Sequence, residues 1–358
     1  MRTFSLLIVI SAIIFSVSCK SKSKSQGEDQ KEQSAKFTLS VDNENNKIDV
    51  LIDGKLFTSY RWPDNVCKPI LYPIFTSAGT EVTRGYPINP RIGERVDHAH
   101  QIGMWLTYGN VNGYDFWGNG SRGLGTTNEN GGLVKHQKVE KMEEGEGKAS
   151  LVTKESWVDP EGNELLEENT EYHFIKDGET LIIDRISKLT ATEKDVSMPD
   201  TKEGMFGIRV ARQLELPSEG KVTVYKEEGK SEKIEGLSDE TVSGDYLSSE
   251  GTSGLEVWGT RARWMDLYGI IGTEKISIVI CDHPDNPSYP TYWHARGYGL
   301  FSANPLGWED FTKGEKQLNF SIAEGESATF RYRVIISSGS YLGEEEINEY
   351  AKNFAEMY

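Results

Sequence analysis

Cysteine is scarce in this sequence: its 358 residues include three, at positions 19, 67 and 281. There is no Cys-x-x-Cys pair and no His-Glu-x-x-His run, so the well-marked zinc motifs are absent. The glycine-rich stretch Gly118–Gly123 is not followed by Gly-Lys-Ser/Thr, which excludes a P-loop for phosphate binding. Cys67 and Cys281 fit either of two interpretations, a disulfide or two buried thiols.

Positive charge is also in short supply. The chain has 39 Lys and Arg residues against 56 Asp and Glu residues, which gives a formal net charge of -17. Because so acidic a surface repels phosphate backbones, nucleic acid is not expected as a partner. Beyond the N-terminal segment the chain has no apolar run of about 20 residues, the length that a membrane-spanning helix needs. A polytopic membrane protein is therefore excluded.

The N-terminus has the pattern of a secretory signal. Residues 1–19 combine a positive start, a short apolar run and small residues before Cys19. The ending Ser-Val-Ser-Cys resembles a bacterial lipoprotein signal, which implies lipidation of Cys19 and a lipid-anchored position in the cell envelope. Ser16 stands where such signals usually have Leu, and the alternative is a plain cleaved signal. Residues 20–36 are polar and lack apolar periodicity, which predicts a flexible tether.

The rest of the chain alternates apolar and polar residues in short runs separated by turn formers. Runs of period two are typical of half-buried β-strands, and they include 37–41, 48–52, 181–186 and 328–336. Helical spacing occurs in Gly343–Phe354, with an acidic first turn that suits a helix N-terminus. About 320 residues of antiparallel strands without a linker predict one all-β domain over 37–358. We expect a large antiparallel two-sheet sandwich with a short C-terminal helix.

The segment Gly314–Val334 has the pattern of two strands joined by a turn. It resembles the closing strands of galactose-mutarotase-like supersandwiches, a fold common among carbohydrate-active proteins. The resemblance implies this fold for the whole domain. It does not fix the function, because one fold serves many activities.

The densest group of histidines lies in Asp97-His98-Ala99-His100-Gln101, shortly before Trp105. In an extended segment, His98 and His100 would point to the same face. Two imidazoles on one face can ligate a metal ion, or they can supply acid–base chemistry because imidazole titrates near neutral pH. The alternative is a pair of packing or surface histidines.

The loop 109–118 combines turn formers, amides, a carboxylate and aromatic side chains. Sugar sites use this mixture, because Trp and Tyr stack on the apolar faces of sugar rings while Asp and Asn hydrogen-bond hydroxyl groups. The candidate sugar-binding residues here are Asn112, Asp115 and Trp117, together with the nearby Trp105. The alternative is a structured hairpin closed by an aromatic plug.

Two further polar clusters complete the candidate site. His294 and Arg296 are two residues apart and suit one face, and Arg fits a planar carboxylate or a developing negative charge. A structural ion pair is the alternative for Arg296. Glu203 precedes an apolar run that contains Arg209, and charged residues are rarely buried unpaired. Glu203 is thus a candidate carboxylate base, metal ligand or partner of Arg209.

In combination, these segments resemble the PmoA-like (methane-oxygenase-PmoA-like) family of secreted bacterial proteins, whose function is not well established. The matching stretches are 68–74, 79–87, 97–105, 111–117, 202–211 and 293–301. Relatives are typical of bacteria that degrade complex polysaccharides, which implies a carbohydrate-related role. The family pattern often has His at the position of Gln101, and this departure counts against a metal centre. Methane oxidation is excluded, because the oxygenase subunit is a polytopic membrane protein.

The sequence therefore favours an enzyme that acts on a sugar or oligosaccharide as a hydrolase, lyase or epimerase. The histidines of the clusters would supply acid–base chemistry, with Glu203 as base or orienting group and the two arginines holding anionic groups. The alternatives are a noncatalytic glycan-binding lipoprotein and a metal-dependent enzyme. No cofactor is predicted, and a divalent metal ion is left open. The expected partners are a sugar and, through Cys19, the lipid bilayer.

Overall fold

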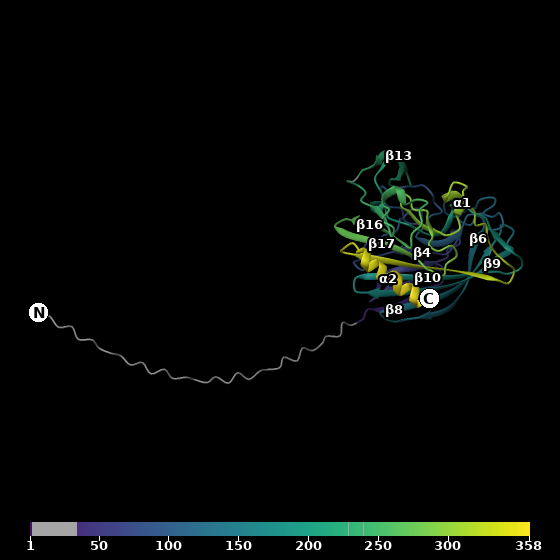
Figure 1. Cartoon of the computed structure of the whole chain (residues 1–358), viewed down its shortest axis with the longest axis horizontal. Helices are drawn as coiled ribbons and strands as arrows, with labels where there is room; N and C mark the ends of the chain where they lie inside the picture. Colours follow the sequence, from purple (N-terminus) through teal and green to yellow (C-terminus); the bar gives the residue numbers. More distant parts are fainter. Residues whose placement is uncertain (2–33, 228, 239) are drawn as a thin grey trace, which may run out of the picture. The chain divides into compact units, whose positions relative to one another are not determined.

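Two antiparallel β-sheets dominate the computed structural model, which describes Met1 and residues 34–227, 229–238 and 240–358 (Figure 1). Ser34–Tyr358 form one compact unit. The predicted signal 1–19, the lipidation site Cys19 and residues 20–33 of the predicted tether lie outside the described part, apart from Met1. Within that part, no helix combines the length and the apolar character that a bilayer crossing requires.

The first sheet has nine strands. In spatial order they are β18 (Tyr292–Trp293), β19 (Leu300–Asn304), β12 (Gly204–Arg209), β5 (Met104–Tyr108), β4 (Ile70–Ile74), β3 (Lys55–Arg61), β2 (Lys47–Ile52), β1 (Lys36–Asp42) and β7 (Gly145–Glu146).

The second sheet has eight strands, in the order β15 (Asp245–Ser248), β16 (Trp264–Ile271), β17 (Glu274–Asp282), β21 (Ser327–Ser338), β10 (Thr180–Ala191), β9 (Glu164–Asp177), β8 (Lys148–Val158) and β6 (Leu133–Glu143). Two small sheets pair β11 (Val196–Met198) with β20 (Phe320–Ile322) and β13 (Ser218–Tyr225) with β14 (Ser231–Leu237). The helices are α1 (Trp308–Phe311), α2 (Glu344–Met357) and the 3-10 turns η1 (Arg212–Leu214) and η2 (Gly254–Val257).

The main core lies between the two large sheets, and side chains of period two build it from both sides. Phe57 on β3 meets Phe174 on β9 with ring centroids 6.2 Å apart. Phe206 on β12 stacks on Tyr332 on β21 at 4.7 Å. All four rings are at least 98% buried, and full burial of one such side chain stabilises the fold by roughly 1.5–3 kcal/mol.

The opposite face of the eight-stranded sheet is covered by α2, which crosses strands such as β10 and β17 in Figure 1. Ile347 and Phe354 are spaced for one helix face, and they pack with Trp264, Val279 and Ile335. The first turn of α2 contains three consecutive glutamates, which favour the positive end of the helix dipole.

The structure confirms the predicted fold class. Each of the four predicted strand segments lies within a strand, namely β1, β2, β10 or β21, and the predicted C-terminal helix is α2. Gly314–Val334 does contain two strands joined by a turn, β20 and part of β21. These two strands do not pair with each other: β20 pairs with β11, and β21 lies between β10 and β17.

Candidate functional site

A cleft of about 410 Å³ gathers most of the polar residues that the sequence singles out. The residues that line it are His98, His100, Gln101, Asp115, Trp117, Gly118, Lys202, Glu203, His294, Arg296 and Tyr298. They come from four segments of the chain that are far apart in sequence.

The pairing of neighbouring strands brings these four segments together. β12 is bonded to β5 on one side and to β19 on the other, and β19 is bonded to β18. The segments flank these strands: 98–101 precedes β5, 115–118 follows it, 202–203 precedes β12, and 294–298 connects β18 to β19. Trp117 packs in a small cluster with Trp105 and Leu300, separate from the main core. The cleft is thus built on the face of the nine-stranded sheet that points away from the eight-stranded sheet.

Seven of the ten predicted catalytic and substrate-binding residues line this cleft, and three do not. Trp105 is fully buried behind it, with its ring centroid 5.1 Å from that of Trp117. Asn112 lies in a turn and does not line the cleft. Its side-chain oxygen accepts a hydrogen bond from the Ser197 amide at 2.8 Å. Arg209 is fully buried and bonded to other side chains. These three side chains lie outside the lining of the cleft.

Asp97 is the electrostatic centre beneath the cleft. Its Oδ1 accepts hydrogen bonds from Arg84 at 3.0 Å and from Arg209 at 2.8 Å, and the two arginine side chains are 1% and 0% exposed. Burial by itself raises the pKa of Asp97, but Arg209, a hydrogen bond from His98, and Arg84 outweigh it and hold this pKa well below its usual range. Arg209 thus pairs with Asp97, whereas the proposed partner Glu203 pairs with Lys202 at 2.8 Å.

His98 lies in a turn. The extended conformation that the sequence analysis considered for His98 and His100 does not form. Its φ is 45°, and its carbonyl accepts a hydrogen bond from the Gln101 amide at 2.9 Å. The imidazole stacks on Tyr298, with ring centroids 4.9 Å apart and planes within 2°. Its Nδ1 lies 3.3 Å from Oδ1 of Asp97 and donates to that carboxylate.

His100 lies deeper, 9% exposed, with its ring centroid 5.8 Å from that of His98. Burial lowers the pKa of His100 to about 2, and the positive charges of Lys68, Arg209 and Arg84 add to this effect. His100 is therefore a neutral imidazole at physiological pH.

His294 is held by a backbone carbonyl. Its Nδ1 lies 2.6 Å from the carbonyl oxygen of Lys202, which can only accept, so Nδ1 donates and Nε2 keeps a lone pair. Burial lowers the pKa of His294 to about 4; nearby Glu203 opposes this shift and Arg296 adds to it. His294 is 2% exposed and lines the cleft, which makes it a neutral proton acceptor.

Two carboxyl groups complete the polar lining. Asp115 accepts hydrogen bonds from the amides of Trp117 at 2.9 Å and Gly118 at 2.7 Å, and burial raises its pKa. Glu203 is about one-third exposed and ion-paired with Lys202. Trp117 and Tyr298 add aromatic side chains to the lining, but Trp117 is 1% exposed and the Tyr298 ring is stacked on His98 with the Arg209 guanidinium 4.8 Å from its centroid.

Sequence reasoning missed several residues of the site. Gln101 appeared only as a departure from a family pattern, yet it lines the cleft, and its side chain accepts a hydrogen bond from Arg209. Tyr298 lies two residues beyond Arg296 and could have been found by extending the same spacing. Lys68 is 2% exposed and donates to the carbonyl of His100 at 2.8 Å. The available signal was a lysine next to the apolar run of β4, because a lysine that is buried with a strand needs polar partners.

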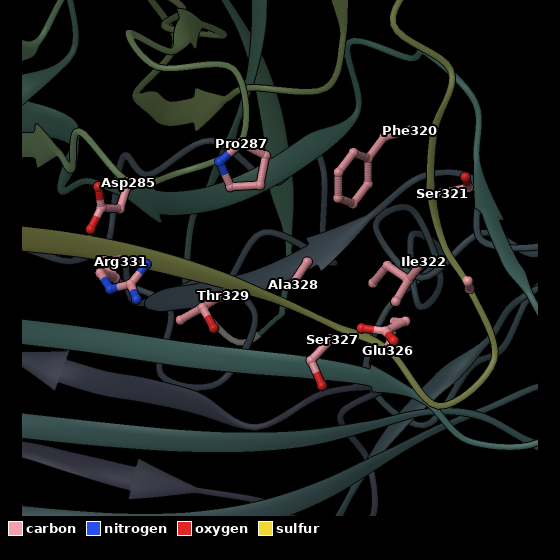
Figure 2. Close-up of a pocket in the computed structure, with 11 residues that line it drawn as sticks. Asp285, Pro287, Phe320, Ser321, Ile322, Glu326, Ser327, Ala328, Thr329 and Arg331 are labelled. Atoms are coloured by element: carbon pink, nitrogen blue, oxygen red, sulfur yellow. The ribbon is translucent and has the colours of Figure 1, made fainter.

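A larger pocket, of about 540 Å³, lies elsewhere, beside β20 and the start of β21 (Figure 2). Asp285 and Arg331 lie toward one end of it, whereas Ser321, Ile322 and Glu326 lie toward the other. It contains no histidine, tyrosine or cysteine. Acid–base chemistry is therefore better supported in the smaller cleft.

Metal ligation and disulfide formation were both open from the sequence. Among the residues that the structure describes, no three His, Cys, Asp or Glu side chains gather in a group that could hold a metal ion. Cys67 and Cys281 are both free: Cys67 is half-buried and Cys281 is buried in β17. The interpretation as two thiols holds, and the disulfide does not form.

Comparison with known proteins gives a family but no activity. Residues 47–352 match a family of unknown function, DUF6807. None of the curated proteins matches the chain.

Among solved structures, the chain is similar to the galactosidase domain of an alpha-galactosidase-sucrose kinase, with 10% identity and a TM-score of 0.37 over 84% of this chain; it spans 42% of that chain. It is also similar to a galactose mutarotase-like protein from Lactobacillus casei ATCC 334, with 9% identity and a TM-score of 0.30, covering 84% of this chain and 99% of that one. A galactose mutarotase related enzyme from Lactobacillus acidophilus has 11% identity and a TM-score of 0.29, with 85% and 97% covered. Likenesses this distant carry no conclusion about activity.

Proposed function

The chain belongs to this family of unknown function, and we propose that its cleft binds a sugar or oligosaccharide and transfers protons on it. The reaction belongs to the hydrolase, lyase or epimerase classes, all of which use proton transfer at a sugar carbon or oxygen. The observation that carries the proposal is the convergence of three imidazoles and two carboxyl groups from distant segments in one cleft.

The protonation states support a division of roles. Nε2 of His294 has a lone pair, because its Nδ1 donates to a carbonyl and the lowered pKa keeps the ring neutral. It can take a proton from a bound hydroxyl or carbon acid. His98, whose Nδ1 lies 3.3 Å from Asp97, is a second proton-transfer group. Glu203 and Asp115 can accept hydrogen bonds from hydroxyl groups of a sugar.

Binding is supported by the aromatic side chains and the cation of the cleft. Trp117 and Tyr298 give the cleft an aromatic lining, although Trp117 is 1% exposed and Tyr298 is stacked on His98. Arg296 stabilises negative charge that develops on the substrate. Asp97, Arg84 and Arg209 act as positioning residues, because they hold His98 and Gln101 from beneath.

The test is turnover of plant, algal and cell-wall oligosaccharides by the purified full-length chain, with products followed by mass spectrometry and by proton NMR, which detects epimerisation. In His98→Gln, Glu203→Gln and His294→Gln, the loss of a proton-transfer group should lower turnover by roughly 10²–10⁴-fold. His173→Gln and Glu235→Gln are matched controls, because both residues lie outside the cleft and should leave turnover unchanged.

Two results would count against an enzyme. If turnover is unchanged in all three cleft variants, the catalytic roles proposed for His98, Glu203 and His294 are wrong. Retention of the chain on polysaccharide gels without any product would instead favour the noncatalytic glycan-binding protein.

We also propose that the chain is a lipoprotein of the cell envelope and a PmoA-like protein. The first rests on residues 1–19 and Cys19, and the second on the motifs that supply the cleft residues. Metabolic labelling with a radioactive fatty acid tests the anchor: the wild-type chain should be labelled and Cys19→Ala should not. Equal labelling of both would show that Cys19 is not the lipidated residue.

A further inference from the structure

Arg296 is partly buried and, among the described residues, has no carboxylate partner, unlike the four buried arginines. Arg84, Arg209, Arg185 and Arg333 each form a salt bridge with Asp or Glu. Among the described residues, no salt bridge involves Arg296: its guanidinium lies over the Trp258 ring, 4.7 Å from the centroid, at the wall of the cleft. Stacking fixes the planar group while leaving its N–H donors available.

The floor of the cleft is positively charged. Lys68, Arg84 and Arg209 lie beneath it with side chains at most 2% exposed, and their hydrogen bonds go to carbonyl oxygens, Gln101 and the single carboxylate of Asp97. Glu94 and Glu215 also act on Arg84, and Glu215 acts on Arg209, but each forms its own salt bridge, with Arg91 and Arg95 respectively.

The wall adds Lys202 and Arg296 against Asp115 and Glu203. The wall and the floor together contain five cationic side chains and three carboxylates, the third being that of Asp97. The cleft therefore has more positive than negative groups, whereas the whole chain has a net charge of -17. This local excess of positive charge favours the binding of a small anion.

From this unpaired guanidinium and this local excess of positive charge, we infer that the substrate carries an anionic substituent, a uronate carboxylate or a sulfate ester, which Arg296 binds. The inference rests on the proposed sugar site and names its substrate class. A partly desolvated guanidinium binds two oxygens of a carboxylate or of a tetrahedral oxyanion through parallel hydrogen bonds, which are stronger than bonds to a neutral hydroxyl.

The experiment compares anionic and neutral sugars on the full-length chain by isothermal titration calorimetry. The probes are methyl glucuronide and methyl galacturonide, their neutral counterparts methyl glucoside and methyl galactoside, and methyl galactoside 6-sulfate. A charge-assisted bond to Arg296 should make at least one anionic probe bind roughly tenfold to a hundredfold more tightly than its neutral counterpart. The carboxylate and sulfate probes distinguish the two sources of the charge.

Arg296→Gln should remove this preference, so that the anionic probe and its neutral counterpart bind the variant with similar affinity. Arg263→Gln is the matched control, because Arg263 is half exposed, lies outside the cleft and should retain the full preference. The wild-type comparison is informative by itself should Arg296→Gln fail to fold.

Each outcome separates this inference from the proposed enzyme. A preference for the anionic probe that disappears in Arg296→Gln supports the inference, even where no probe is turned over. Equal affinity for anionic and neutral probes, a preference that survives Arg296→Gln, or no binding of any probe overturns it. Turnover of neutral oligosaccharides without an anionic preference would leave the proposed enzyme intact and remove only the anionic substrate.

Discussion

Replacement of Asp97 by Asn tests the electrostatic centre beneath the cleft. The substitution keeps the shape of the side chain but removes the charge that Arg84 and Arg209 share. Removing one partner of a fully buried ion pair costs about 3–5 kcal/mol. The arginines are at most 1% exposed, but the Asp97 side chain is 35% exposed and partly solvated, which lowers our expectation to about 2–3 kcal/mol.

The assay is urea-induced unfolding of the wild-type chain and Asp97→Asn at pH 7. Asp64→Asn is the control, because Asp64 is exposed and should change the free energy of unfolding by less than about 0.5 kcal/mol. A loss below about 0.5 kcal/mol in Asp97→Asn would refute the view that this carboxylate compensates the two buried arginines.

The pH dependence gives a second check on the same residue. Because the folded state lowers the pKa of Asp97, its stabilising effect is complete above the unfolded pKa of about 4 and is lost as the pH falls toward the folded value. The difference in unfolding free energy between wild type and Asp97→Asn should therefore be largest near neutral pH and shrink in strong acid. A difference that grows below pH 4 would contradict the assignment.

Two further predictions concern the histidines and the floor of the cleft. Burial lowers the pKa of His294 to about 4, so its ring should not titrate between pH 5 and 8 in an NMR experiment; a midpoint near 6.5 would contradict the buried neutral imidazole. A Cβ at Gly207 would lie 2.9 Å from the Trp105 ring and 3.1 Å from that of Trp117, so Gly207→Ala should cost about 1–3 kcal/mol in urea unfolding and weaken sugar binding. Gly343→Ala is its control, because nothing lies within 4 Å of the added Cβ and the φ of -81° suits alanine; equal effects of the two would contradict the packing argument.

The candidate site shows what the spacing of residues in the sequence can predict and what it cannot. His294 and Arg296 were expected on one face, and both line the cleft. His98 and His100 also both line it, although the segment is a turn with positive φ at His98 and not the extended run that the spacing argument considered. Local spacing identified the residues but not the backbone that presents them.

Long-range pairing decided which charged residues reach a ligand. Arg209 and Arg296 look alike in sequence, yet Arg209 is buried against Asp97 and Arg296 lines the cleft. Two segments more than 100 residues apart create this difference, and no local pattern contains it. Lys68 was passed over for the same reason, because its partners, the carbonyls of His100 and Trp117, come from other segments.

The amino-acid sequence by itself determined that this chain forms strands, that a helix follows them, and which residue types are available for chemistry. Alternation, turn formers and capping are local properties, so a single stretch of chain contains them. Only the tertiary structure decided that β12 lies between β5 and β19, which places His98, Glu203 and His294 around one cleft. Strand order depends on contacts between residues far apart in the chain, and their energies become defined only when the sheets have formed.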